Sequence, residues 1–114
     1  VRPETYINEN IDPDWIPLLQ TPPFPEYTSG HSVVSTVSAE ILSQLLGDHI
    51  AFTDSTEVEY GLFPRSFPTI KQAAAEACIS RFYGGIHFMP SIINGIEEGK
   101  NIGKYVMSRI KTKK

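Results

Sequence analysis

The sequence is poor in cysteine and in positive charge, and it has no long hydrophobic run. Its 114 residues include a single cysteine, Cys78, so the chain can form no internal disulfide, and we expect a small buried thiol there. No apolar run approaches the roughly 18 residues that a membrane-spanning helix needs, and we expect no transmembrane segment. The formal net charge of −3 gives no support for nucleic-acid binding. With 40% hydrophobic and 20% charged residues, the composition is typical of one globular domain.

The residue patterns of several enzyme classes are missing as well. No pair of carboxylates has a spacing that favours glycosidase chemistry. No group of His, Cys and acidic residues has the spacing of a zinc site. The glycine-containing stretch GGIHFMPSIING does not match a nucleotide-binding P-loop. Glycosidase, zinc-enzyme and nucleotide-binding functions therefore have no support.

Three segments have the apolar periodicity of amphipathic helices. They cover residues 31–46, 68–83 and 90–110. The first two are followed by glycine, which commonly ends a helix. The side chains that we expect to face inward recur at spacings of three and four; they are Val34, Val37, Ile41 and Leu45 in the first helix, Ile70, Ala74, Ala77 and Arg81 in the second, and Ile92, Ile96, Gly99, Ile102, Val106 and Ile110 in the third.

The remaining segments lack this periodicity. Residues 1–30 hold most of the prolines and are interpreted as an ordered loop, with one helical turn at 13–19. Residues 48–66 form a connector rich in turn-forming residues, and no segment alternates convincingly as a strand does. The predicted fold class is all-α, a helical bundle in which small residues allow the helices to approach closely.

Two residues near the end of the second predicted helix have useful chemistry. Arg81 shares a face with side chains that we expect to be buried, and a buried arginine needs an anion or a carboxylate. A salt bridge, or a position at the exposed end of that face, would also satisfy it. His87 follows Gly84 and Gly85, which allow the chain to turn back toward Arg81. A satisfied core histidine is the plainer interpretation of His87.

The stretch TSGHS at the start of the first predicted helix is a stronger candidate. A helix N-terminus presents free backbone N–H groups and the positive end of the helix dipole, which together bind anions. Gly30 lets an oxyanion approach the backbone, Ser29 can donate a hydrogen bond, and His31 adds a group that titrates near neutrality. Taken alone, Ser29 as a simple helix cap explains the stretch equally well.

Together with Arg2, these features make up the components of one oxyanion pocket. Arginine offers fixed, multidentate donors to a phosphate-like group. One histidine can attack or ligate the central atom while the other moves protons. The residues that we expect to share this site are Arg2, Ser29, Gly30, His31, Arg81 and His87.

These residues resemble the signature of the vanadium-dependent haloperoxidases and the related type 2 phosphatidic acid phosphatases. That signature reads Lys-x6-Arg-Pro, then Pro-Ser-Gly-His, then Ser-Arg-x5-His. Here Arg2 and Pro3 match the end of the first block, TSGH at 28–31 the second, and SRFYGGIH at 80–87 the third. The resemblance covers almost the whole chain, and SRFYGGIHF is most similar to the bacterial haloperoxidase-like branch.

The resemblance implies a role for each residue. His87 would ligate the vanadium of vanadate, or be the phosphorylated nucleophile of a phosphatase, and His31 would be the acid–base group. In a haloperoxidase, vanadate activates hydrogen peroxide as a Lewis acid without changing its oxidation state, and halide attacks the bound peroxide. The residues that would hold the equatorial oxygens of vanadate, or of phosphate as the alternative occupant, are Arg2, Ser29, Gly30 and Arg81.

Three positions depart from the signature. The signature lysine would precede the first residue of this chain. Thr28 replaces the usual proline. Ser91 stands four residues after His87, where phosphatases of this group often carry an aspartate that orients the histidine. Glu97 or Glu98 would be the substitutes for that aspartate.

We therefore interpret residues 1–114 as the C-terminal catalytic portion of a vanadate-dependent haloperoxidase, a partial bundle that acts on hydrogen peroxide and halide. The alternatives are an acid phosphatase that hydrolyses phosphate esters through a phosphohistidine, and a non-catalytic oxyanion-binding fragment. The resemblance also implies a periplasmic or secreted location. Bundle helices without all their neighbours expose apolar faces, so we expect homo-oligomers.

Overall fold

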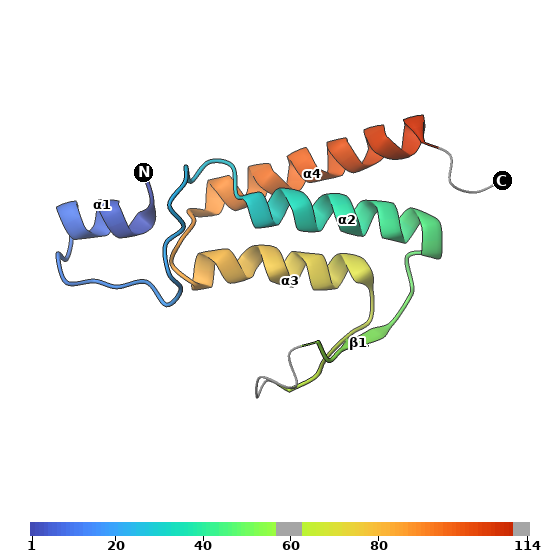
Figure 1. The fold of residues 1–114 in the computed structure, drawn as a ribbon, viewed down its shortest axis with the longest axis horizontal. Coiled ribbons are helices and arrows are strands. Elements are labelled where there is room, and N and C mark those ends of the chain that lie inside the picture. The colour runs from blue at the N-terminus through green and yellow to red at the C-terminus, as the bar shows by residue number, and fades with distance from the viewer. Residues whose placement is uncertain (57–62, 111–114) are drawn as a thin grey trace.

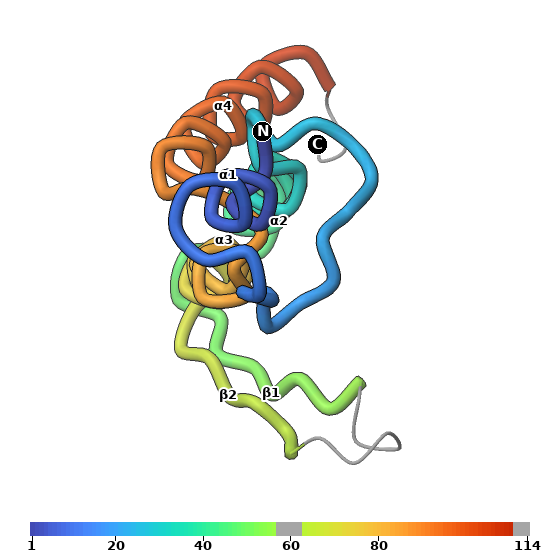
Figure 2. The backbone as a smooth tube through the Cα atoms, turned by 90° about the vertical axis from the view of Figure 1, so that its left-hand side faces the viewer, coloured from blue at the N-terminus to red at the C-terminus, as the bar shows by residue number. Residues whose placement is uncertain are grey.

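The structure is a computed structural model, and it describes residues 1–56 and 63–110. Within these ranges, α2, α3 and α4 lie side by side, with α1 beyond one end of them, as Figure 1 shows. The hairpin projects away from the helices on the side of α3, as the end-on view in Figure 2 shows. The predicted helical bundle is thus confirmed, with a small hairpin added. The elements in chain order are α1 (Pro3–Asn10), α2 (Gly30–Leu46), β1 (Phe52–Asp54), β2 (Arg65–Phe67), α3 (Ile70–Tyr83) and α4 (Met89–Arg109).

The helix boundaries follow from local capping chemistry. Ser29 caps α2, because its Oγ accepts a hydrogen bond from Ser32 N at 3.4 Å. The helix ends at Gly47, whose φ of +104° favours glycine. Thr69 caps α3 in the same way, so Pro68 precedes the helix instead of lying in its first turn. The three predicted helices agree with α2, α3 and α4 to within two residues at each end.

The predicted loop at the N-terminus contains a helix, α1, that the periodicity did not indicate. Only Pro3 of this helix is buried, so α1 lacks the apolar face that a periodic pattern would have indicated. Its local start signals are present, since Pro3 occupies the first turn and Glu4 follows it. The helical turn predicted at 13–19 is absent. Asp12 accepts a hydrogen bond there from Asp14 N, which makes a turn without a helix.

The predicted connector contains a short antiparallel hairpin. Phe52 pairs with Phe67 at one end of it and Asp54 pairs with Arg65 at the other, and the two phenylalanine rings lie 5.5 Å apart between centroids. Each strand has three residues, too few for an alternating pattern to be recognised. Residues 57–62 of the connector lie outside the described residues.

Glycines bring α2 and α4 into close contact. A Cβ added at Gly99 would lie 2.7 Å from both Thr36 Cβ and Val33 O, so no side chain fits there without movement. Gly95 and Gly103 of α4 meet α2 in the same manner one turn earlier and one turn later. The close helix contacts that the small residues predicted are therefore confirmed.

The buried face of α2 is not the one that its apolar periodicity predicts. Val34 is 65% exposed, and Val37, Ile41 and Leu45 are only partly buried. The close approach of the glycines on α4 selects the α2 face with small or polar side chains, which leaves the valine outside. The residues of α2 that are buried are Ser32, Thr36, Ala39, Glu40 and Ser43.

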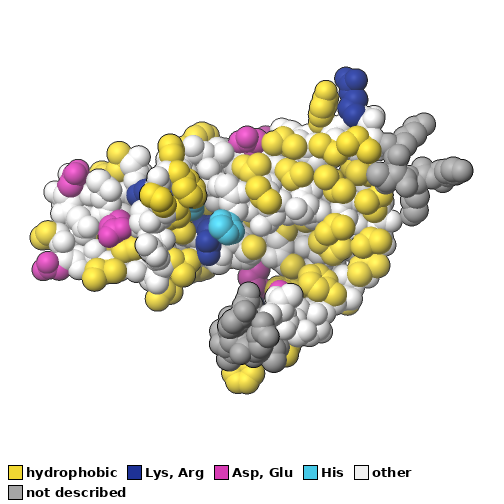
Figure 3. Space-filling model, viewed as in Figure 1, with side chains coloured by type: hydrophobic (Ala, Val, Ile, Leu, Met, Phe, Trp, Pro, Cys, Tyr) yellow, Lys and Arg dark blue, Asp and Glu magenta, His cyan; other side chains and the backbone are white. Residues whose placement is uncertain are grey.

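The predicted inward faces of the other two helices are partly correct. In α4, Ile92 and Gly99 are buried as predicted, whereas Ile102 and Ile110 are exposed. Figure 3 shows hydrophobic side chains gathered over the face that α2 and α4 form.

In α3 the predicted face is only partly buried, and Cys78 is the residue that is fully enclosed, as a small buried thiol. No helix within the described ranges is both long and apolar enough to cross a bilayer.

Candidate oxyanion site

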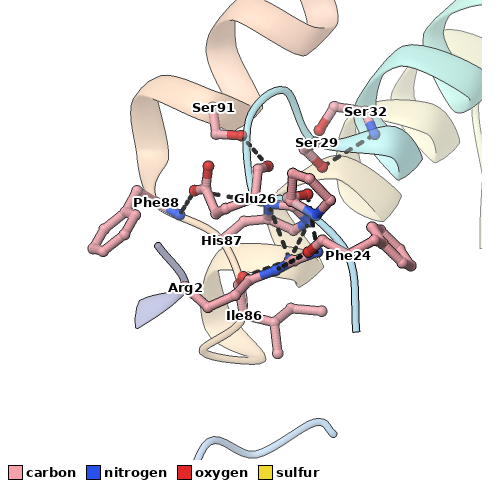
Figure 4. Close-up of polar contacts among 10 residues, drawn as sticks. Arg2, Phe24, Glu26, Ser29, Ser32, Ile86, His87, Phe88 and Ser91 are labelled. Carbon is pink, nitrogen blue, oxygen red and sulfur yellow. Dashed lines mark hydrogen bonds and ion pairs between the residues drawn. The ribbon is translucent and has the colours of Figure 1, made fainter. Parts of the chain in front are cut away.

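The predicted site residues meet at one end of the helical layer. The loop before α2, the first turn of α2, the end of α3 and the turn into α4 converge there, and the N-terminal residues close over them (Figure 1). The close-up in Figure 4 shows Arg2, Glu26, Ser29 and His87 within this group, contributed by three segments far apart in sequence. This end of the molecule is therefore a tertiary assembly and not a local motif.

Arg2 joins the N-terminus to two other segments. Its guanidinium donates from Nε and Nη2 to Phe24 O at 3.1 and 3.0 Å, and from Nη2 to Pro25 O at 3.3 Å. Its Nη1 donates to Ile86 O at 2.9 Å and lies 3.0 Å from His87 Nε2. Protein atoms thus accept hydrogen bonds from all three guanidinium nitrogens. Arg2 is brought to the predicted site, and its donors are directed at carbonyls and at the histidine.

Arg2 also lies against the His87 ring. Its Nη1 is 3.0 Å from Nε2 and 3.5 Å from Nδ1, so it contacts both ring nitrogens and not one lone pair alone. The backbone of Glu26 makes a hydrogen bond with the imidazole as well. His87 is buried, as the plainer interpretation expected, and its ring lies against a guanidinium.

Glu26 is a site residue that the sequence analysis missed. Its side chain is buried, its Oε1 accepts a hydrogen bond from Phe88 N at 2.7 Å, and the same oxygen lies 3.8 Å from His87 Nδ1. Of the substitutes considered for the missing aspartate, Glu97 is exposed, and Glu98 accepts a hydrogen bond from Thr28 Oγ1 at the surface. The one sequence signal that could have indicated Glu26 is its position in the loop just before TSGH.

The start of α2 combines both interpretations of TSGHS. Ser29 is fully buried and caps the helix, so the cap is present. The backbone N–H groups of Gly30 and His31 donate to no acceptor among the described residues. A Cβ at Gly30 would meet no atom of another segment within 4 Å, so the surface beside Gly30 is open. The N–H groups of Gly30 and His31 are therefore donors that the cap leaves free.

Arg81 connects the two histidines electrostatically. Its Nε is buried and has no hydrogen-bond partner in the part of the chain that the structure describes. Desolvation lowers the pKa of His31, and the positive charge of Arg81 lowers it further. The pKa of His87 is lowered by desolvation first, then by Arg2 and Arg81, against an opposing effect of Glu26. The structure thus brings Arg81 close to both histidines.

The arrangement favours an anion. The guanidinium groups of Arg2 and Arg81 and the carboxylate of Glu26 act on His87, and the lowered pKa values leave both histidines uncharged near neutral pH. The unpartnered Nε of Arg81 and the free N–H groups of α2 are donors without acceptors, which a bound oxyanion would supply. His49, the third histidine, is exposed and belongs to a different segment.

Comparisons with known proteins agree with this assembly. A family model described as the VCPO second helical-bundle domain matches residues 2–113. The chain belongs to this family. The resemblance carried by TSGH and SRFYGGIH is thereby confirmed, and no curated protein matches the chain.

Solved structures of vanadium enzymes resemble this VCPO-type domain. A bacterial vanadium-dependent iodoperoxidase is 55% identical to it with a TM-score of 0.93, over 96% of this chain and 27% of that protein. The holo form of a bacterial vanadium-dependent chloroperoxidase is 22% identical with a TM-score of 0.79, over 95% of this chain and 29% of that protein. Its apo form gives 21% identity and a TM-score of 0.76, over 95% and 30%.

The sequence identities and coverages of these structures limit what the likeness shows about this chain. The likeness to the chloroperoxidase shows the fold alone, whereas the iodoperoxidase is a clear homologue. The chain spans less than a third of the length of each of these proteins. The VCPO-type domain is therefore related to the vanadium haloperoxidases, as a helical-bundle portion of them.

Proposed function

We propose that this chain is the C-terminal catalytic portion of a vanadate-dependent haloperoxidase, which oxidises halide with hydrogen peroxide. One observation carries the proposal: the buried Nε of Arg81 lacks a partner at the place where the free N–H groups of α2 and both histidines meet. The homology to a bacterial vanadium-dependent iodoperoxidase supports vanadate as the group that these donors bind.

The residues present fit such an oxyanion. Arg81 would donate from Nε, and the N–H groups of Gly30 and His31 would donate from the start of α2. His87 would offer a ring nitrogen as the ligand atom. When bound, vanadate supplies Lewis-acid activation of hydrogen peroxide. Ser29 would contribute mainly by capping the helix whose N–H groups bind.

Arg2 has two tasks in this proposal. In the structure its Nη1 lies 3.0 Å from His87 Nε2, so ligation through that nitrogen would require Nη1 to move away from it. The hydrogen bonds of Nε and Nη2 to Phe24 O keep the guanidinium at the site while Nη1 is released. Nη1 would then be available as a donor to the oxyanion. Arg2 would therefore both join the segments of the site and contribute a donor to the bound anion.

His31 would be the acid–base group. Desolvation and Arg81 lower its pKa, so the imidazole is neutral at neutral pH and can accept a proton from a bound peroxide or water. It lies in the first turn of α2, next to the free N–H groups, on an exposed part of the site that substrate can reach. Such a base loses its function as the pH falls below its folded-state pKa.

Halide oxidation by the full-length protein tests the proposal. Purified protein should oxidise iodide, bromide or chloride with hydrogen peroxide only after vanadate is added, and Arg81→Ala should abolish this vanadate-dependent activity. A matched control is Arg109→Ala, an exposed arginine at the far end of α4, which should leave activity unchanged. Equal activity with and without vanadate, or full activity of Arg81→Ala, would contradict the proposal.

An acid phosphatase is the second candidate, and Glu26 is the observation that favours it. Phosphatases of this group often carry a carboxylate that orients the nucleophilic histidine, and Glu26 Oε1 lies 3.8 Å from His87 Nδ1 although Ser91 occupies the usual position. Hydrolysis of a phosphate ester that vanadate inhibits would support this candidate. Calorimetry that detects neither vanadate nor phosphate binding would favour a non-catalytic fragment.

A further inference from the structure

Ser91 connects α4 to the loop that leads into α2. It is 1% exposed and lies in the first turn of α4, shortly after His87. Its Oγ donates a hydrogen bond to Glu26 O at 2.9 Å, as Figure 4 shows, and its carbonyl accepts one from Ser29 N at 3.3 Å. A single buried residue of α4 therefore holds the loop before α2 at two points, one on each side of Tyr27 and Thr28.

The Glu26 carbonyl that Ser91 binds is also a partner of the His87 ring. Desolvation lowers the pKa of His87, and a hydrogen bond with the Glu26 backbone opposes this effect. A hydrogen bond that favours the protonated ring is one that the imidazole donates, so its acceptor is the Glu26 carbonyl. A carbonyl oxygen has two lone pairs, so it can accept from the serine and from the imidazole together. The Ser91 hydroxyl therefore fixes the acceptor against which the His87 ring is oriented.

The second contact of Ser91 fixes the start of α2. Ser29 N donates to the Ser91 carbonyl, and the N–H groups that follow it, of Gly30 and His31, are the donors that the cap leaves free. This contact uses the backbone of Ser91, so it does not depend on the hydroxyl. Loss of the hydroxyl should therefore loosen the His87 ring while the start of α2 stays attached to α4.

We propose that Ser91 is a positioning residue, whose hydroxyl holds the Glu26 carbonyl and so keeps the His87 ring at a fixed place relative to the free N–H groups of α2. The proposal rests on the proposed function for the identity of the oxyanion that would bind between them. The orientation of the imidazole, in contrast, is a property of the anion-free protein. The ring is thus held by a neutral carbonyl that a buried serine fixes from another segment.

Ser91→Ala in the full-length protein is the decisive variant. It keeps the Ser91 carbonyl, and Glu26 Oε1 still accepts from Phe88 N at 2.7 Å, so the loop stays attached to α4 and the fold should be retained. Ser108→Ala is the matched control, because it removes a hydrogen bond from a serine to a carbonyl at the exposed end of the same helix. Gly99→Ala is the second control, because its methyl group disturbs the packing of α2 against α4 away from the site.

The ring signals of His87 in the proton NMR spectrum of the anion-free protein give the first readout. They should shift or broaden in Ser91→Ala, because the ring loses its fixed acceptor, and they should stay unchanged in Ser108→Ala. Calorimetry with vanadate gives the second readout. Ser91→Ala should bind vanadate about 10-fold more weakly, as expected when a ligand histidine loses the group that orients it, and both controls should bind as the wild type does.

Ser91→Cys replaces the hydroxyl by a thiol, which is a weaker donor. It should bind vanadate more weakly than the wild type and more tightly than Ser91→Ala, and if the alanine variant does not fold, wild-type affinity of Ser91→Cys would overturn the proposal. A folded Ser91→Ala with wild-type ring signals and affinity would overturn it too, as would a Gly99→Ala that weakens vanadate binding equally. A wild type that binds neither vanadate nor phosphate would overturn the proposed function, and the His87 ring signals would still decide the role of Ser91.

Discussion

The two ends of the α2–α4 helix pair are built in opposite ways. At the end near α1, buried polar groups of distant segments are joined by directional hydrogen bonds around Arg2 and His87. Farther along, Gly99 and Gly103 of α4 meet the α2 backbone and the side chains of Thr36 and Glu40, and larger apolar residues such as Leu46 remain exposed. From this comparison we expect stability to be more sensitive to lost hydrogen bonds at the first end and to added volume at the second.

Arg2→Ala should have the largest effect on stability. It removes the donors to Phe24 O and Ile86 O and leaves the Glu26 carboxylate without its nearby positive charge, so we expect a loss of about 3 kcal/mol. Chemical unfolding of the full-length protein measures it. The control is Arg65→Ala, which breaks an exposed ion pair with Glu76 and should cost less than about 1 kcal/mol. Equal losses in the two variants would show that the buried hydrogen bonds of Arg2 stabilise the fold no more than the exposed ion pair of Arg65 does.

Gly99→Ala should destabilise the other end by about 1–3 kcal/mol, because the new methyl group would lie 2.7 Å from a backbone carbonyl of α2. Unfolding curves measured alongside those of Gly30→Ala supply the comparison. Gly30 has open space around it, so its alanine variant should stay within about 0.5 kcal/mol of the wild type. If both variants are equally stable, the close α2–α4 contact does not determine stability.

The exposed apolar face should cause the isolated chain to self-associate. Val34, Leu42 and Leu46 are exposed on α2, and such a face lowers its free energy by contact with another apolar surface. Light scattering at increasing concentration should therefore report a rising mass, and Val34→Ser with Leu46→Ser should reduce it. Lys104→Ser, a polar exposed position on α4, is the control. A monomer at high concentration would contradict this expectation.

The pH dependence of stability should be the smallest effect, and it should arise at the site end. The folded-state pKa values of His31 and His87 lie below the ordinary imidazole value of 6.5. The unfolded chain therefore binds more protons between the two values, and stability should fall as the pH drops through 6.5 toward the folded-state pKa. Unfolding curves from pH 8 to pH 5 measure the slope. His87→Gln should reduce it, and an unchanged slope would exclude His87 as its source.

Much of the fold was predictable from the sequence because its signals are local. Apolar periodicity with glycine stops located α2, α3 and α4. The helix α1 and the hairpin were missed because α1 buries only Pro3 and because three-residue strands are too short to show alternation. The buried face of α2 was assigned wrongly, since hydrophobicity does not reveal which face a glycine-bearing neighbour can approach.

The candidate site was predictable to the level of its parts. The spacing of TSGH and SRFYGGIH, and Arg2 with them, indicated an oxyanion site before any geometry was known, and the structure places these residues at one end of the bundle. Glu26 could not be selected, because a single glutamate in a proline-rich loop has no periodicity and no partner within its own segment. Its partners His87 and Phe88 lie about sixty residues away.

The sequence by itself determined α2, α3 and α4, the family and the chemical types that meet at the site, because each of these depends on residues close together or on fixed spacings. Only the tertiary structure decided which donors are free and which are occupied. Arg2 is satisfied by carbonyls, Arg81 Nε lacks a partner among the described residues, and Glu26 stands behind His87. Hydrogen bonding and burial depend on where distant segments come to lie, and that is a property of the folded chain.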